Sequence, residues 1–263
     1  MHENLQDLKA SGSARLGGGT YRNVNVSGSA YIDGDVACEA FVSSGSVKVA
    51  GGVKGDRFKA SGSARIEGNA SVGEFRVGGT ASVGGNLDAK ELLTSGTFKV
   101  EGDVTAKNEV KLSGISAVGG AIRAGTLHAT GSLKAAKGIE CEALTLAGAF
   151  EVGGLINAGT ADISLAGQSR IDEIGGERVS VRRGGILGAL GIPLPLELPF
   201  GLGGFLTADS IEATCVFLEF TRAKVVRGAE VTIGSGCEID RAEYSVSLDV
   251  AEDAVVRERI KVD

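Results

Sequence analysis

Tryptophan is absent from this 263-residue chain, and aromatic residues make up only 5% of it. The 27 basic and 33 acidic residues give a net charge of -6, and they are interspersed, so no basic stripe forms. Nucleic-acid binding requires a basic surface, and binding of single strands also requires aromatic rings on which bases stack. The composition therefore argues against a nucleic-acid partner. A hydrophobic share of 43% still suffices for a thin, aliphatic core.

Metal-ligating side chains are scarce and scattered. The chain has two histidines, His2 and His128, and no C-x-x-C motif. Its four cysteines lie far apart in the sequence, at Cys38, Cys141, Cys215 and Cys237. We therefore expect no metal site, and we interpret the cysteines as buried free thiols of a protein in a reducing cytoplasm.

Targeting and cofactor signals are also lacking. The N-terminal stretch MHENLQDLKA has no apolar run and no cleavage signal, which predicts a cytoplasmic protein. The segment GGILGALG contains the glycines of a phosphate-binding loop, but no β-α-β context surrounds it. We therefore expect no nucleotide and no other cofactor.

Glycine, by contrast, is abundant and periodic, with 42 residues in the chain. The glycines of the Ser-Gly-Ser-like steps serve as markers of a repeat of about 17 residues. These markers are Gly12, Gly28, Gly45, Gly62, Gly79, Gly96, Gly114, Gly131, Gly148 and Gly167. The period is too short for a helix pair or a propeller blade. It fits one turn of a β-solenoid with three short strands and three tight bends.

Aliphatic residues recur at fixed distances from each marker. The residues four positions on are all aliphatic: Leu16, Ile32, Val49, Ile66, Val83, Val100, Val118, Ala135, Val152 and Ile171. Further mostly apolar columns stand eight and thirteen positions on, and apolar and polar residues alternate within a repeat as in a strand. If identical positions stack at the strand spacing of about 4.8 Å, these columns form one continuous core. The sequence thus predicts an all-β, single-stranded β-helix with about 17 residues per turn and glycines at its bends.

The repeat divides the chain into five parts. Residues 1–8 form an N-terminal tail, and residues 9–182 contain the β-helix repeats. An apolar insertion rich in proline and glycine follows at residues 183–206, and further turns at residues 207–250. Residues 251–263 are a charged C-terminal tail. All three prolines lie in the insertion, where they argue against a membrane-spanning helix.

Three interpretations of the insertion compete. It is a loop folded over the solenoid flank, a self-association surface, or an element that touches a membrane while Arg182 and Arg183 meet lipid headgroups. The residues expected to contact a membrane or a partner are Ile186, Leu187, Leu190, Ile192, Leu194, Leu196, Phe200, Leu202, Phe205 and Leu206. In each case we expect the solenoid to fold without residues 186–206.

The repeats SGSARIEGNA and SGTFKVEGDV, with the later stretch AKVVRGAEVTIGSGCEIDRAEY, resemble the bactofilins, polymer-forming cytoskeletal proteins of bacteria. The longer bactofilins of Gram-positive rods are the most similar, over about residues 8–245. The resemblance implies a right-handed β-helix with a triangular cross-section that polymerises end to end without nucleotide. It also implies a scaffold in cell shape, motility or envelope organisation, with envelope or motility proteins as partners. Some bactofilins reach the membrane through a hydrophobic N-terminal segment, but this N-terminus is polar, so a membrane contact would fall to the insertion.

An open solenoid end has unpaired backbone groups and exposed core side chains, and it must be capped or paired. Neither end of this chain has a proline or an evident amphipathic helix to block it. We therefore expect a homopolymer or homo-oligomer. Its contacts would be made by Leu8, Leu16, Val24 and Val26 at the N-terminal end, and by Val246, Leu248, Val250, Val255 and Ile260 at the C-terminal end. The alternative is a monomer whose two tails fold back as caps.

Two other functions remain as alternatives to this scaffold. One is a binding module, such as an adhesin-like or ice-binding solenoid, although the threonines are expected in different columns: Thr20, Thr80, Thr94, Thr97 and Thr105. The other is a hexapeptide-type acyltransferase, which usually needs a catalytic histidine. His128 stands at an ordinary surface position, and acidic pairs such as Glu140 and Glu142 share one solvated strand face. We therefore expect no catalytic residues and no enzymatic activity.

Overall fold

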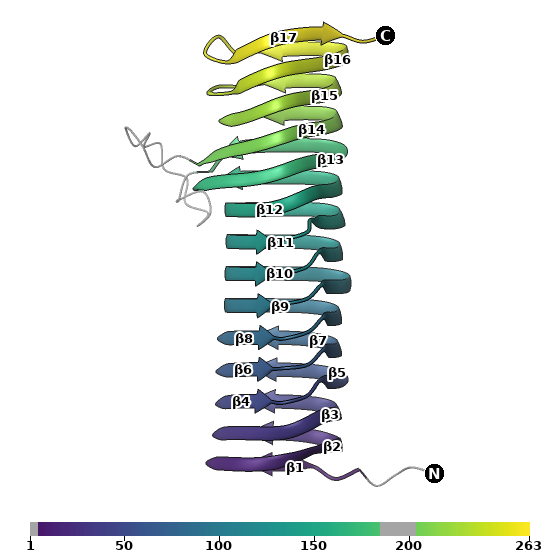
Figure 1. Ribbon diagram of the computed structural model, residues 1–263, viewed down its shortest axis with the longest axis vertical. Coiled ribbons are helices and arrows are strands. Elements are labelled where there is room, and N and C mark those ends of the chain that lie inside the picture. The colour runs from purple at the N-terminus through teal and green to yellow at the C-terminus, as the bar shows by residue number, and fades with distance from the viewer. Residues whose placement is uncertain (1–4, 185–203) are drawn as a thin grey trace. The chain divides into compact units, whose positions relative to one another are not determined.

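In a computed structural model, the chain is described at residues 5–184 and 204–263. Those residues form parallel β-strands joined by short bends and turns, and there is no helix among them. The chain divides into two compact units, Met1–Gly125 and Thr126–Asp263, and each is a β-solenoid in its own right (Figure 1).

The strands of the first unit are β1 (Leu8–Ala10), β2 (Ser13–Val26), β3 (Ser29–Ser43), β4 (Ser46–Val49), β5 (Val53–Ala60), β6 (Ser63–Ile66), β7 (Ala70–Val77), β8 (Thr80–Val83), β9 (Leu87–Val100), β10 (Val104–Val118) and the beginning of β11 (Ile122–Ala135). Each residue pairs with its counterpart one turn later, so that Phe41 lies against Phe58 and Phe58 against Phe75. The sequence separation of these partners equals the predicted period. The predicted fold class, an all-β solenoid with about 17 residues per turn, is confirmed.

The aliphatic files predicted from the sequence form the core of this unit. In the column four residues after the marker glycines, Ile32, Val49, Ile66, Val83 and Val100 pair in succession. Each of these side chains is at most 1% exposed. Stacking of like side chains therefore removes the whole column from water, which is the main favourable term in the stability of the turn.

Phenylalanine rings also stack in this core, and their positions change along it. The rings of Phe41, Phe58 and Phe75 follow one another with centroids 4.9 Å apart. The next residue in that column is Leu92, and Phe98 of a different column supplies a ring 6.2 Å from that of Phe75. An alanine precedes Phe98 one turn earlier in its own column. Loss of volume in one column thus accompanies a gain in another, as a close-packed interior requires.

The marker glycines occupy a corner where successive turns approach closely. A Cβ atom on Gly62 would lie less than 3.0 Å from the carbonyl oxygen of Gly45, and one on Gly79 would meet the carbonyl oxygen of Gly62 in the same way. At Gly12 and Gly96 the backbone also has positive φ, 89° and 116°. The sequence predicted that glycine is needed here for a bend. The structure shows that close contact between successive turns is the more general reason for glycine at this column.

A second corner is held by a ladder of side-chain oxygens that the apolar pattern did not reveal. In each step, a carboxylate or amide oxygen accepts a hydrogen bond of 2.6–3.0 Å from a backbone N–H one turn later. The donor–acceptor pairs are Gly52 to Asp35, Asn86 to Asn69, Asp103 to Asn86 and Ala121 to Asp103. Because a corner interrupts the strand ladder, this Asx ladder satisfies backbone donors that would otherwise lack a partner.

The second unit contains the rest of β11, then β12 (Ile139–Leu165), β13 (Gln168–Arg183), β14 (Phe205–Leu218), β15 (Thr221–Ile233), β16 (Glu238–Val250) and β17 (Val255–Lys261). Its inner column runs in paired succession through Ile171, Ala208, Ala223, Ile239 and Val256. Residues 207–250 thus stack as further turns. The segment that the sequence assigned to a charged tail includes a strand, because Val255–Lys261 pairs along β16.

The apolar insertion interrupts a corner of this unit. One turn before it, Leu165 and Gln168 are separated by two residues, and they pair with Arg183 and Phe205 respectively. Gly184 and Gly204 therefore correspond to those two corner residues, and the insertion proper is residues 185–203. The predicted contact residues from Ile186 to Leu202 fall outside the described residues.

The last two predicted contact residues of the insertion belong to β14. Leu206 is 0% exposed in the core, so its assignment to a membrane or partner contact is wrong, because it pairs between Ser169 and Thr221 in the solenoid ladder. Phe205 is half-buried at the surface. The sequence did not show that β14 begins at Phe205, because an apolar run does not distinguish surface residues from core residues until the strand pairing is known.

Deletion of residues 185–203 should leave the solenoid folded. The deletion joins Gly184 to Gly204 and restores a two-residue corner like the one between Leu165 and Gln168. We expect cooperative melting in calorimetry, with a midpoint within a few degrees of the full chain. Deletion of residues 185–204 is the control, since a corner shorter by one residue forces strain or a register slip that turns core side chains outward. Loss of cooperative melting in the first variant would contradict the assigned boundary.

Alanine substitution at two glycines should separate crowding from backbone entropy. Gly62→Ala places a methyl group against the Gly45 carbonyl, so we expect a loss of about 2 kcal/mol in the free energy of unfolding. Nothing lies within 4 Å of a Cβ on Gly78, so Gly78→Ala should be neutral or stabilising by about 0.5 kcal/mol. Urea denaturation measures both. Equal effects of the two changes would show that inter-turn contact does not select the marker glycines.

Candidate functional site

The N-terminal end of the first unit has an open strand edge. Leu8 and Ala10 of β1 pair with Val24 and Val26, which are only 0% and 3% exposed. The prediction that Val24 and Val26 are displayed at this end is therefore wrong, because the short strand β1 already covers them. Leu8 itself is half-buried.

The first half of β2 lies beyond the cover of β1. Leu16 pairs with Ile32 on its inner side, and no described residue pairs with it on the other. Its side chain is half-buried, whereas that of Ile32 is 0% exposed. The N-terminal edge therefore consists of β1 and the Ser13–Thr20 part of β2, and it displays core side chains at Leu8 and Leu16.

The C-terminal end of the second unit displays more apolar surface. Among the described residues six large hydrophobic side chains are exposed, and three of them, Val246, Val255 and Val262, lie beyond Tyr244. Val246 is 63% exposed and Val255 52%. This concentration marks the end as the main exposed apolar region of the described chain.

The remaining residues predicted at this end are half-buried. Leu248 and Val250 pair on one side with Val231 and Ile233, which are 1% and 0% exposed. Ile260 is also half-buried on β17. β17 covers only the Glu238–Tyr244 part of β16, so the rest of β16 and the outer side of β17 form the C-terminal edge. All five residues that the sequence predicted for this end lie along that edge.

The two edges carry opposite charge. Residues 5–23 contain three basic side chains, Lys9, Arg15 and Arg22, and one acidic side chain, Asp7. Arg22 donates a hydrogen bond of 3.1 Å to Asp7, which lowers the pKa of that carboxyl. Residues 245–263 contain five acidic and three basic side chains. The N-terminal edge is thus positive and the C-terminal edge negative.

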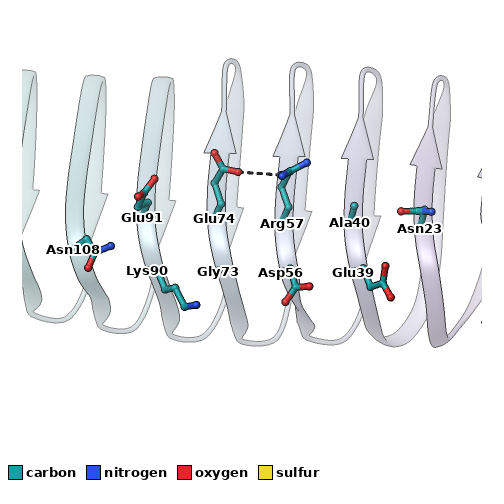
Figure 2. Close-up of a pocket in the computed structure, with 10 residues that line it drawn as sticks. All are labelled: Asn23, Glu39, Ala40, Asp56, Arg57, Gly73, Glu74, Lys90, Glu91 and Asn108. Carbon is teal, nitrogen blue, oxygen red and sulfur yellow. Dashed lines mark hydrogen bonds and ion pairs between the residues drawn. The ribbon is translucent and has the colours of Figure 1, made fainter. Parts of the chain in front are cut away.

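One flank of the first unit has a shallow, charged depression of about 510 Å³ (Figure 2). Figure 2 shows its side chains in rows on successive strands rather than converging on a point, with Arg57 and Glu74 in an ion pair of 3.1 Å. Further along the row, Glu91 pairs in register with Glu74. Ion pairs as exposed as this one contribute about 0–1 kcal/mol each, so the row is a solvated face of the sheet.

A second flank of the first unit carries hydroxyl groups in one file. Five residues stack in register there, namely Ser29, Ser46, Ser63, Thr80 and Thr97. Thr80 and Thr97 thus share a column, which corrects the expectation that the threonines occupy different ones. Tyr31 lies beside this file between Arg15 and Lys48, whose cationic groups are 5.0 and 5.7 Å from its ring centroid. The depression lined by Tyr31 and by the file from Ser29 to Thr80 has a volume of about 640 Å³.

The four cysteines are free thiols, but the prediction that all of them are buried is correct for only two. Cys38 and Cys237 are buried, while Cys141 and Cys215 are half-buried. Burial raises the pKa of Cys38, Cys141 and Cys237 to about 11, so these thiols stay protonated near neutral pH. A protonated thiol is a poor nucleophile and a poor metal ligand.

Metal-ligating side chains do not come together in the part of the chain that the structure describes. No three His, Cys, Asp or Glu side chains there are close enough to hold a metal ion. His128 is half-buried on β11. Within residues 5–184 and 204–263, no helix has the length and apolar character needed to span a bilayer.

Two proteins of Bacillus subtilis (strain 168) are similar to part of the chain. Uncharacterized protein YhbF is 34% identical over 110 residues, which are 41% of this chain and 42% of YhbF. Uncharacterized protein YhbE is 40% identical over 98 residues, which are 36% of this chain and 38% of YhbE. The chain therefore spans about two fifths of the length of these relatives. No family model and no solved structure matches it.

Proposed function

We propose that this protein is a self-assembling scaffold whose copies stack end to end without nucleotide. The observation that supports the proposal is the pair of uncovered end turns, where side chains of core columns such as Leu16 and Leu248 are only half-buried. Like the bactofilins that its repeats resemble, it would serve cell shape, motility or envelope organisation together with envelope or motility proteins.

The energy available from stacking is of the size that association requires. Between two neighbouring turns, β7 and β8 pair with β9 at eleven residue positions. At about 1 kcal/mol net per ladder hydrogen bond, a comparable contact between two copies contributes roughly 10 kcal/mol. Association costs about 4–15 kcal/mol in lost freedom. Burial of the core-column residues that are half-buried at the two edges, Leu8, Leu16, Leu248 and Val250, adds to the favourable side, so stacking does not need a ligand.

Charge and register favour contact between unlike ends. A positive N-terminal edge attracts a negative C-terminal edge, whereas two identical edges repel each other. Strand register within each unit, together with the 17-residue period of the sequence, assigns Lys9 and Asp249 to equivalent positions of the repeat. In a head-to-tail contact, Lys9 of one copy would therefore lie beside Asp249 of the next.

A solenoid binding module is the second candidate function. The file of hydroxyl groups from Ser29 to Thr97, with the cation-flanked ring of Tyr31 beside it, favours this candidate. A flat file of groups spaced by about 4.8 Å suits an extended polymeric ligand better than a small molecule.

Lysine in the core columns of the C-terminal edge should weaken assembly strongly. We expect Leu248→Lys with Val250→Lys to weaken association at least about a hundredfold, because these residues continue the buried columns of Val231 and Ile233 and stacking would bury two ammonium groups. Val246→Lys with Val255→Lys is the matched control, since it adds the same two charges at the same end, where Val246 is 63% exposed and Val255 continues the exposed column of Glu238 and Arg222. Light scattering over a dilution series and negative-stain electron microscopy measure the result. A wild-type chain that stays monomeric at all concentrations would refute the scaffold.

Cysteine cross-linking should report the polarity of the stack. In a chain without its native cysteines, Lys9→Cys and Asp249→Cys together should form a ladder of covalent multimers on oxidation. Paired strands bring Cα atoms to about 4.8 Å, within the range of a disulfide. Each single variant should stay uncross-linked. Efficient dimers from either single variant would show contact between like ends, which contradicts the head-to-tail arrangement but not the stacking itself.

A further inference from the structure

Three arginines and three phenylalanines meet at the corner of the second unit where residues 185–203 are inserted. The guanidinium groups of Arg182, Arg183 and Arg222 lie over the rings of Phe217, Phe220 and Phe205, at 5.1, 4.2 and 4.5 Å from the ring centroids. These six residues come from β13, β14, the bend after β14, and β15. We call them the Arg-Phe corner.

The phenylalanines of this corner differ from the others that the structure describes. Phe41, Phe58, Phe75, Phe98 and Phe150 are core residues, each at most 2% exposed. The three phenylalanines of the corner are all half-buried at the surface. Packing of the solenoid core therefore does not explain why phenylalanine occurs at these three positions, and another role must explain it.

Phe220 also adopts a backbone conformation that its residue type disfavours. Its φ is 46°, and no other described non-glycine residue has positive φ. One turn later the corresponding corner residue is Gly236, with φ 68°. A Cβ on Gly236 would collide with the Phe220 ring, so that glycine makes room for it. A bulky residue at positive φ is strained, and such strain is typical of positions kept for function rather than for folding.

Three carboxylates lie near the three arginines of this corner, and that of Asp253 accepts a hydrogen bond of 3.2 Å from the backbone N–H of Gly236. Glu238 pairs with Arg222 at 2.9 Å. Glu219 accepts a hydrogen bond of 3.3 Å from the backbone N–H of Arg183. Within the described residues, the guanidinium groups of Arg182 and Arg183 lie over aromatic rings and form no ion pair with a carboxylate. They remain available to bind an anionic group such as a phosphate.

We propose that the Arg-Phe corner is a docking surface for an anionic lipid bilayer. Guanidinium groups bind headgroup phosphates, and partly exposed rings enter the boundary between headgroups and acyl chains. The chain leaves this corner after Gly184 and returns at Gly204, and the stretch between them carries a single charged residue, Glu197. An apolar stretch tethered directly beside the guanidinium groups favours lipid over a hydrophilic partner.

This surface is separate from the edges invoked for assembly. β13, β14 and β15 are each paired on both sides, so docking at the corner leaves the outer side of β17 free. Membrane docking therefore does not depend on the proposed scaffold function, and a monomer would dock by the same corner.

Vesicle co-sedimentation of the full chain tests the proposal. We expect binding to vesicles of phosphatidylglycerol and phosphatidylcholine, and at least about tenfold weaker binding to phosphatidylcholine alone. Phe220→Gly should weaken binding to the anionic vesicles about tenfold, through loss of the ring, while the melting temperature stays equal or rises because glycine relieves the strained φ.

Charge variants complete the test and guard against misfolding. Arg182→Gln with Arg183→Gln should also reduce anionic vesicle binding about tenfold. Arg57→Gln with Arg76→Gln, the same charge change on an exposed flank of the first unit, should leave it unchanged. Equal losses from both pairs would mean that only net charge matters and would overturn the assignment. Undiminished binding of Phe220→Gly to anionic vesicles, or equal binding of the wild-type chain to neutral vesicles, would also overturn it. The same holds if the corner variants lose self-association but keep their lipid binding.

Discussion

The spacing between neighbouring turns controls nearly everything else in each unit. Parallel strands lie about 4.8 Å apart, so every residue has the same position of the next turn as its nearest neighbour. A side chain that suits one turn must therefore suit the turn above and the turn below. This is why Val49 lies against Ile66 in the core and Gly45 beneath Gly62 at a corner. The periodic sequence is the direct result of this constraint.

The same constraint explains where function can reside. Flank side chains of a solenoid stand in parallel rows, such as the row that contains Arg57 and Glu74, so they rarely converge on one point as catalytic groups must. The repeat is interrupted at two kinds of position. One is an end, where a turn lacks a neighbour, and the other is a corner at which the chain departs from the period. The proposed assembly edges are ends, and the Arg-Phe corner adjoins the largest interruption of the repeat.

The sequence predicted the inner files well because burial of apolar side chains leaves a strict periodic record. It predicted the end residues only in part: Leu16 and Val246 are exposed to some degree, but Val24 is covered by β1. A strand as short as β1 leaves too weak a pattern to be recognised. Leu206 was misplaced for a related reason, since an apolar run shows no boundary where it enters a strand.

By itself the sequence determined the period, the class of fold and the identity of the core columns, because these depend on local alternation and on the repetition of residue types. Tertiary structure alone decided which backbone donors the Asx ladder satisfies and which strands cover the residues at each end. It also decided that Phe220 would take a glycine conformation beneath Arg183. Such features depend on distances between residues of different turns, and a linear pattern does not contain those distances until the turns are stacked.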